Sequence, residues 1–373
     1  MNKKLLTLAI GAAIAAPMTA AQADVKVYGA AQIEIANVKN DGTGAISFNS
    51  GSVQPKTTKT LMSDNKRGRL GVSADEDLGG SMKGLAKFEW NLDTADNVDG
   101  ATGGGTSVFG ARDSYVGLGG GFGTLRLGRS GSPYKQSGVA LDPFITTTLE
   151  ARNNFGMSGN KDGYGVLNGH NSFVNNGIFY TSPSLAGVMI DAYVGADDTG
   201  ADSTSASQGV QTGGDLSAVV SWKGGPAKVF VGYSRLNNTA PASGFGEPKA
   251  FKLGGEFKIS GMHNIAFQYE KANVDNSTTA QYAKYGAKAD YLFLSYTLTL
   301  GNFSLVPQFG QMKTDGGTSG DEKGSYLVLG GIYKMSKTFR AFGGYRGTKL
   351  QQAGVTLDPR DEKVITVGLR KDF

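Results

Sequence analysis

The residue types that usually carry out catalysis are poorly arranged for it in this chain. Ser132 and Lys135 fit the S-x-x-K motif of serine acyl-transfer enzymes, and Ser63-Asp64-Asn65 fits their S-D-N motif. The two motifs occur in the reverse order, and no K-T-G follows. The only histidines are His170 and His263, and there is no cysteine, which leaves little for a triad or a thiolate metal site. We therefore do not expect an enzyme, and we expect no cofactor and no metal.

Charged residues alternate with apolar ones along several stretches of the chain. This pattern is typical of a β-sheet that has one face in contact with water. Arg69, Lys87 and Arg126 each alternate with apolar residues, so that the charged and the apolar side chains occupy positions of opposite parity (odd or even residue number). Because neighbouring side chains of a strand point to opposite faces, parity places these three cations, together with Glu89, on the wet face. Charges lining an aqueous passage can orient ions and dipolar solutes.

Stretches that alternate with a period of two recur from residue 24 to the end of the sequence, and they predict half-buried strands. It is clearest in four stretches, at Val25–Ile35, Phe251–Ile259, Leu292–Leu300 and Ile365–Leu369. Tight turns near 78–80, 119–121, 184–187, 224–226, 260–261 and 336–337, all but the last containing Gly, separate the strands at one end. Long polar loops near 37–64, 95–107, 132–170, 197–212, 238–247, 275–285, 315–323 and 350–360 separate them at the other.

Eight long loops imply eight hairpins and 16 strands, with tight turns on one side and long loops on the other. So many amphipathic strands offer more apolar face than one soluble core needs, and closure removes exposed edges. The sequence therefore predicts one all-β domain, a 16-stranded antiparallel transmembrane β-barrel wide enough to hold water. Recurrent aromatic residues fit the girdles of such a barrel; they are Phe88, Trp90, Trp222, Tyr233, Tyr333 and Tyr345.

The N-terminus has the features of a secretory signal. Lys3 and Lys4 precede an apolar stretch at 5–16, and Ala21-Gln22-Ala23 is a small-residue cleavage site. We therefore predict a signal peptide at 1–23 and the barrel at 24–373. Without the two signal lysines the formal net charge of +5 falls to +3, too weak a bias to favour nucleic acid as a partner.

Three groups of motifs resemble the trimeric porins of Gram-negative bacteria, especially the branch that includes the neisserial porins. They are Arg69-Leu70-Gly71-Val72 with Asp75–Gly79, Arg112–Leu118 with Gly121–Arg129, and Tyr180-Thr181-Ser182-Pro183. Val367-Gly368-Leu369-Arg370 is similar to that family as well. The resemblance implies a homotrimer in the outer membrane, in contact with outer-membrane lipid and lipopolysaccharide, in which each subunit passes small hydrophilic solutes and ions.

The resemblance also implies a constriction. The third long loop, here 132–170, is expected to fold into the barrel and to set acidic groups against a basic wall. Arg112 matches the pore arginine of the family and joins Arg69, Lys87 and Arg126 in that wall. Asp142 and Glu150 are the expected acidic counterparts on the loop, with Asp162 a weaker candidate.

Two further residues receive roles outside the pore. Arg129 has the parity of the outer face, where a charge at mid-membrane costs about 2–4 kcal/mol, so we expect a subunit contact there, meeting Asp96 or Asp99 of a neighbour. Phe373 ends the chain on an amphipathic strand and resembles the signal that the barrel-assembly machinery reads. Pro307 removes a ladder hydrogen bond inside a strand, and we expect a β-bulge there.

Other functions of the same fold stay open at this point. A substrate-specific channel and an adhesin or receptor without an open pore are both compatible with the loop sequences. Asp93, Asp96 and Asp99 lie in one loop and could hold a calcium ion, although a solvated acidic loop is the simpler interpretation.

The family commonly has arginines where this chain has Phe173 and Phe179, on the inward parity of one strand. These lumen aromatics thin the basic wall, so we predict a weaker anion preference than is typical of the family, with tolerance of aromatic solutes. Reversal potentials in a salt gradient measure this preference directly. Strong anion selectivity would overturn the prediction.

Overall fold

A computed structural model describes residues 23–42, 46–48, 51–63, 68–92, 94–95, 109–151, 169–196, 214–236, 247–275, 288–315, 322–352 and 360–373. The predicted signal peptide falls almost wholly outside these residues. Among them, no helix has the length and apolar character needed to span a membrane.

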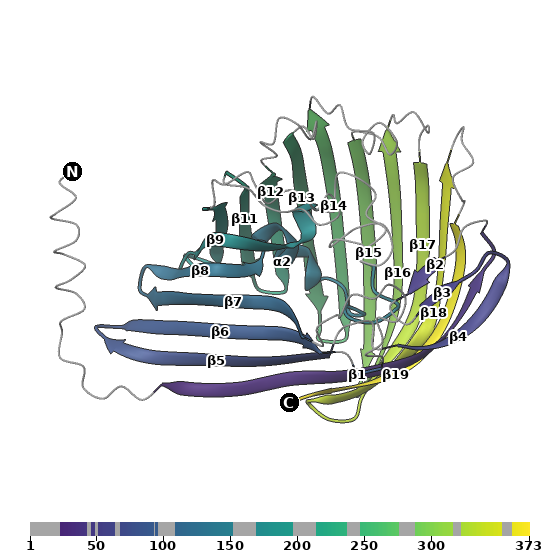
Figure 1. The fold of residues 1–373 in the computed structure, drawn as a ribbon, viewed down its shortest axis with the longest axis horizontal. Helices are drawn as coiled ribbons and strands as arrows, with labels where there is room; N and C mark the ends of the chain where they lie inside the picture. The colour runs from purple at the N-terminus through teal and green to yellow at the C-terminus, as the bar shows by residue number, and fades with distance from the viewer. Residues whose placement is uncertain are drawn as a thin grey trace.

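The described chain is almost entirely β-strand (Figure 1). The first strands are β1 Asp24–Asn40, β2 Ile46–Phe48, β3 Gly51–Val53, β4 Thr57–Ser63, β5 Gly68–Gly79, β6 Met82–Leu92, β7 Phe109–Gly120, β8 Gly123–Gly131, β9 Phe173–Thr181 and β10 Val188–Gly195. They continue as β11 Leu216–Gly224, β12 Ala227–Arg235, β13 Glu247–Ile259, β14 His263–Asp275, β15 Lys288–Leu300, β16 Phe303–Asp315, β17 Glu322–Lys334, β18 Phe339–Gln352 and β19 Arg360–Asp372. Helix α2 Pro133–Val139 and the 3-10 turn η3 Gly169–Asn171 lie between β8 and β9.

The predicted closed barrel of 16 antiparallel strands is confirmed. Seventeen strands form one sheet, and β4 and β5 occupy a single place in it because both pair with β1, through residues 34–40 and 24–30 respectively. The other edge of β1 pairs with β19. Every place in the ring therefore has two neighbours, with β1 on one side of the β4/β5 place and β6, paired with β5, on the other.

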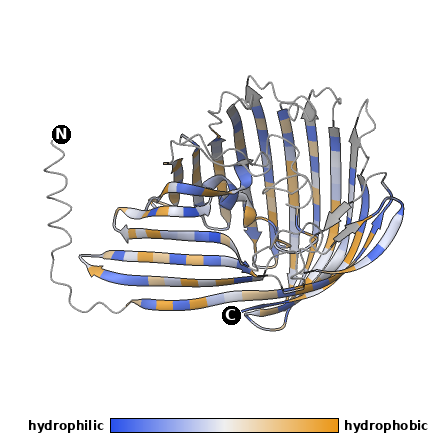
Figure 2. Ribbon diagram, in the orientation of Figure 1, coloured by the Kyte–Doolittle hydropathy of each residue, from blue (hydrophilic) through white to orange (hydrophobic). Residues whose placement is uncertain are grey.

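Hydrophobic and hydrophilic residues alternate along the strands (Figure 2), and side-chain exposure shows that the alternation separates the two faces of the wall. Apolar side chains of one parity are exposed outside, such as Phe251 (59%), Leu294 (47%) and Val367 (61%). Their neighbours of the other parity, such as Lys252 (2%) and Thr366 (3%), are buried inside. The outer face is thus the apolar one, as a protein surrounded by lipid requires.

Two local expectations need correction. The first long loop was expected over 37–64, but β1 continues to Asn40, β4 begins at Thr57, and the hairpin β2–β3 lies between them. The Thr-rich β4 alternates well enough to extend the wall beside β1. The bulge expected at Pro307 is absent, since β16 keeps its register with β17 through Pro307–Leu329. Pairing with β15 is only interrupted there, between Ser295–Gln308 and Leu298–Leu305.

The seam between the two ends of the wall is completed at Gly29. Its N–H donates to the carbonyl oxygen of Phe373 at 2.9 Å, and the Phe373 N–H donates back at 3.0 Å. The Phe373 ring also covers Gly29, since a Cβ atom at Gly29 would lie 2.5 Å from the ring and 2.6 Å from the carbonyl oxygen of Arg69.

We predict that Gly29→Val destabilises the folded barrel by about 1–3 kcal/mol, because the new side chain collides with backbone that cannot move aside. Thermal unfolding of the detergent-solubilised protein measures this as a lower transition temperature. Ala31→Val is the matched control, because Ala31 lies two residues further on the same face and is exposed. Equal transition temperatures for the two variants would contradict the crowding at the seam.

Candidate functional site

The inner wall of β6 and β7 carries a cluster of paired charges. Glu89 accepts a hydrogen bond from Arg112 Nε at 2.5 Å and lies 3.6 Å from the Lys87 ammonium. Lys87 forms a second ion pair with Asp113 at 2.9 Å, and the Tyr28 hydroxyl donates to Glu89 at 2.9 Å. Two of the predicted basic residues are therefore largely neutralised by acids of the same wall.

Asp113 is the partner that parity alone misses. It follows Arg112 directly, so in a regular strand the two side chains would point to opposite faces. The register between β6 and β7 shifts between Phe88 and Trp90, which places one extra residue in β7. Such a bulge re-aims side chains, and it brings both groups to the same cluster. The unbroken polar run Arg112-Asp113-Ser114 is the sequence signal that could have indicated it.

Arg69 and Arg126, the other two predicted basic residues, have different surroundings. Arg69 is half-buried on β5, and its Nε has no hydrogen-bond partner. Arg126 on β8 lies over the rings of Tyr115 and Phe179, at 5.3 and 5.4 Å from their centroids. No carboxylate of the described residues is bonded to it. Arg126 is thus a partly exposed cation that lies against two aromatic faces.

The two predicted lumen aromatics are both in contact with cations. Phe179 is fully buried and packs on Tyr193, with ring centroids 4.9 Å apart. Phe173 is half-buried, and three cations lie over its ring: Arg112 at 4.8 Å, Lys135 at 4.7 Å and Arg129 at 5.5 Å. Arg129 also donates to the carbonyl oxygen of Ala111 at 3.3 Å and to the side-chain oxygen of Asn175.

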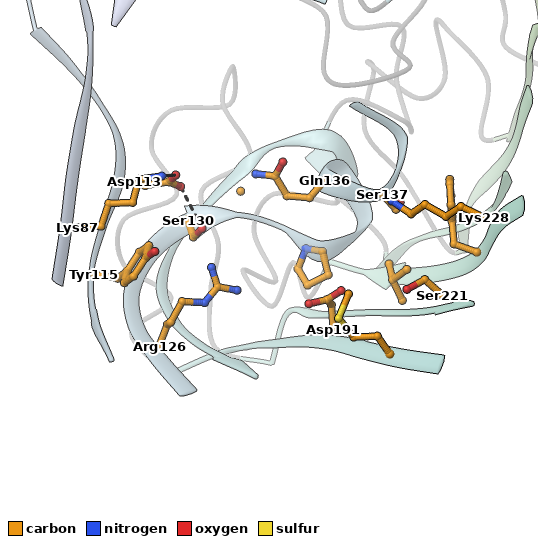
Figure 3. A pocket seen from close by; sticks show the side chains of 15 residues that line it. Lys87, Asp113, Tyr115, Arg126, Ser130, Gln136, Ser137, Asp191, Ser221 and Lys228 are labelled. Atoms are coloured by element: carbon orange, nitrogen blue, oxygen red, sulfur yellow. Dashed lines mark hydrogen bonds and ion pairs between the residues drawn. The ribbon is translucent and has the colours of Figure 1, made fainter. Parts of the chain in front are cut away.

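A cavity of about 250 Å³ lies between this wall and helix α2 (Figure 3). Arg126 and Lys87 line one side of it, and Lys228 lines the other. Asp113 and Asp191 supply two negative charges, so the lining carries one net positive charge. Hydroxyl and amide groups from Ser130, Ser137, Ser221 and Gln136 complete a polar surface in which an anion or a dipolar solute can be held.

Helix α2 is fixed to the opposite wall by a buried cation. Lys252 on β13 donates to the carbonyl oxygen of Tyr134 and to the side-chain oxygen of Asn171, both at 2.7 Å, and it lies over the Tyr134 ring at 4.0 Å. His170 Nδ1 is 2.8 Å from the Ser234 hydroxyl. Burial lowers the pKa of His170 to about 3, so its imidazole stays neutral.

The two acidic residues predicted for the third loop are buried. Asp142 is 3% exposed and accepts hydrogen bonds from the Phe144 N–H (2.9 Å), the Ala151 N–H (2.6 Å) and the Gln308 side chain (2.7 Å). Glu150 is fully buried and accepts from the Thr146 N–H at 2.5 Å. Burial raises the pKa of Asp142 to about 6, although its three donors act in the opposite direction. The hydrogen bonds that Asp142 and Glu150 accept within residues 142–151 hold this part of the loop in its conformation. Asp162 lies outside the described residues, as do Asp93, Asp96 and Asp99.

The loop also packs its apolar residues on an apolar part of the inner wall. Phe144 and Leu149 are fully buried and belong to one cluster with residues of β11–β18. Gly330 of β17 pairs with Gly344 of β18, and together they leave room for these side chains. A Cβ at Gly330 would lie 2.5 Å from the Phe144 ring, and one at Gly344 would lie 3.1 Å from Leu149. Segment 132–151 therefore lies against the inner wall and leaves the charged cluster of β6–β8 facing it.

Comparison with known proteins agrees with this architecture. The family model for Gram-negative porins matches residues 7–352. The major outer membrane protein P.IA of Neisseria meningitidis serogroup B (strain MC58) is 34% identical over 155 residues, which cover 39% of this chain and 37% of that protein. P.IB of Neisseria gonorrhoeae is 32% identical over 142 residues, covering 38% and 36%. The matched stretch thus spans little more than a third of the length of these relatives.

Solved structures show the same fold at low sequence identity. The anion-selective porin from Comamonas acidovorans has a TM-score of 0.71 and 18% identity, covering 94% of this chain and all of that one. A trimer form of OmpT from Vibrio cholerae has a TM-score of 0.62 and 16% identity, covering 94% and 99%.

A closed barrel with an apolar exterior and a charged interior is an outer-membrane channel fold. The chain belongs to the Gram-negative porin family, and its place is the outer membrane. Its family and fold are those of a channel rather than of an enzyme. The described residues also contain no cluster of three or more potential metal ligands.

We predict that Phe144→Ala loosens the docked loop, because truncating a fully buried phenylalanine costs about 3–5 kcal/mol. The expected result is a larger and noisier single-channel current, with a barrel that remains folded. Gly330→Val should act in the same direction by filling the space that Phe144 occupies. Val139→Ala, a change at a partly exposed residue of α2, is the control. Wild-type current traces from both Phe144→Ala and Gly330→Val would show that this packing does not hold the loop.

Proposed function

We propose that the protein is a general-diffusion porin that lets small hydrophilic solutes and ions cross the outer membrane through the lumen of each barrel. The observation that carries this proposal is the division of the closed wall into an apolar outer face and an inner face with charged groups at a partly open cavity. A wall of 16 strands is too wide to be filled by its own side chains alone. Water and small solutes therefore have a route through it.

In this proposal the constriction lies between the inner wall of β5–β8 and the docked segment 132–151. Arg69, Lys87, Arg112 and Arg126 form its basic side. Glu89 and Asp113 within that side offset two of the four positive charges, which supports a weak rather than a strong anion preference. Asp142 and Glu150 contribute by shaping the loop opposite, since both are buried.

The proposed assembly is a homotrimer embedded in outer-membrane lipid and lipopolysaccharide and inserted by the barrel-assembly machinery. The trimer form of OmpT has the same fold and supports the oligomeric state. Arg129 remains a proposed subunit contact, although its side chain is already bonded within its own chain. Phe373 remains the proposed assembly signal, and its exposed ring (60%) on the outer face is accessible to a partner.

A substrate-specific channel of the same fold is a second candidate, favoured by one observation. The cavity beneath α2 combines Arg126 and Lys228 with the aromatic and apolar side chains of Tyr115, Phe230 and Val219. Such a mixture can bind an organic anion more firmly than a wide aqueous pore does. Saturation of the current by one solute would identify this behaviour.

The test is single-channel recording in a planar bilayer. Large, ohmic, unsaturated steps that arrive in threes are expected of the purified protein. We further predict that Arg126→Gln moves the reversal potential toward cation preference, because it removes a pore-facing charge without leaving a bonded carboxylate unpaired. Lys337→Gln, in a short turn at the opposite end from the long loops, is the charge-matched control. Absence of any conductance from folded protein would refute the diffusion proposal.

A further inference from the structure

The cavity beneath helix α2 holds charges of both signs, and only some of them are paired. Lys87 and Asp113 form an ion pair with each other at 2.9 Å. The charges of these two lining residues therefore offset each other. The other charged residues of the lining are Arg126, Asp191 and Lys228.

Arg126 and Asp191 have opposite charges and line the same cavity, but they do not pair with each other. Among the described residues neither side chain forms an ion pair. The Asp191 carboxylate accepts a hydrogen bond from the Thr181 hydroxyl at 2.7 Å, which supplies no positive charge. Arg126 lies over the rings of Tyr115 and Phe179. Within the described part of the chain, the cavity thus contains a cation and an anion without a charged partner.

The strand register keeps these two groups apart. Arg126 of β8 stands opposite Phe179 of β9, and Asp191 of β10 stands opposite Thr181 of the same strand. Strand β9 runs between them and separates their backbones by two interstrand spacings, about 9–10 Å. Figure 3 shows Arg126 and Asp191 below Gln136 of helix α2. A small molecule that carries both charges can bridge this gap, whereas a simple ion satisfies only one of the two groups.

Lys228 lies on the far side of the cavity and has an acid near it. Glu256 of β13 stands directly opposite Lys228, although its carboxylate is paired with Lys258 at 3.3 Å. Lys228 is therefore a less suitable anchor for a ligand than Arg126. The argument is carried by Arg126 and Asp191.

The rest of the lining indicates the size and the character of the bridging molecule. Met189, Val219 and Phe230 contribute apolar surface, and the last two are buried. The volume of about 250 Å³ lies below the roughly 300–1,000 Å³ of pockets that take drug-sized ligands. The cavity therefore fits a small molecule with two opposite charges and an apolar part.

We propose that this cavity is a binding site for small zwitterions, of the class of α-amino acids with an apolar side chain. The carboxylate accepts charge-assisted hydrogen bonds from Arg126, and the ammonium group donates to Asp191, each over about 2.8 Å. The apolar side chain then lies against Val219 and Phe230. The proposal rests on the proposed function, because solutes reach the cavity through the lumen. It refines the substrate-specific candidate, since an organic anion without an ammonium group would leave Asp191 unpaired.

Isothermal titration calorimetry of the folded, detergent-solubilised protein tests this site with three probes that differ in the charges they carry. Leucine carries both charges, N-acetyl-leucine lacks the positive one, and leucinamide lacks the negative one. The titrations are made at a mildly acidic pH that keeps leucinamide protonated. The wild type is expected to bind leucine about tenfold more tightly than either analogue, because each analogue loses one charge-assisted contact.

Two variants separate the two contacts. Asp191→Asn should weaken leucine binding about tenfold without weakening the binding of N-acetyl-leucine, which has no ammonium group. Arg126→Gln should weaken the binding of leucine and of N-acetyl-leucine about tenfold without weakening that of leucinamide. Asp75→Asn, at an exposed residue of β5 outside the cavity lining, is the matched control and should bind all three probes like the wild type.

Two results would overturn the zwitterion site. One is equal affinity of the wild type for leucine and either analogue, and the other is equal affinity of the wild type and Asp191→Asn for leucine. Single-channel recordings distinguish such a failure from a failure of the diffusion proposal. A wild type that conducts but gives either result loses only the zwitterion site. A silent wild type that binds leucine as predicted loses only the diffusion pore.

Discussion

The structure depends on one constraint, that every backbone N–H and C=O of the wall must be paired before the wall can stand in hydrocarbon. Strand β1 carries the closure, because it pairs with β19 on one edge and with β4 and β5 on the other. Once the ring is closed, inside and outside are separate environments. The alternation of side chains then has a chemical meaning, with lipid on one face and water on the other.

Closure also explains why the third loop can dock firmly. The inner wall of β11–β18 is apolar where Val306, Val328 and Phe342 are buried, and such a surface is unfavourable in contact with water. Segment 132–151 covers it with Tyr134, Phe144 and Leu149, and Lys252 and Gln308 anchor the segment by hydrogen bonds. The wall of β6–β8 keeps its charged groups instead. Segment 132–151 therefore narrows the lumen because its apolar side chains pack against the inner wall of β11–β18, as side chains do in a hydrophobic core.

The fold could be predicted from the sequence because period-two alternation and loop spacing are local properties, repeated over the whole chain. The cluster of Lys87, Glu89 and Arg112 could be predicted in part by the same parity. Asp113 could not, because a single extra residue in β7 reverses the parity of all that follows. The burial of Asp142 could not be predicted either. It depends on Gln308, 166 positions away in the chain, and no local pattern reports such a contact.

The charges of this protein follow one rule on both faces of the wall. Where lysine or arginine side chains crowd together, an acid of the same chain usually lies between them, as Glu89 does for Arg112 and Lys87, and Asp41 for Lys39 and Lys363. The cavity under α2 differs in this respect, because Arg126 has no bonded carboxylate among the described residues. Since such a cation attracts anions from its surroundings, this is a position where the charge of a passing solute can replace the missing acid.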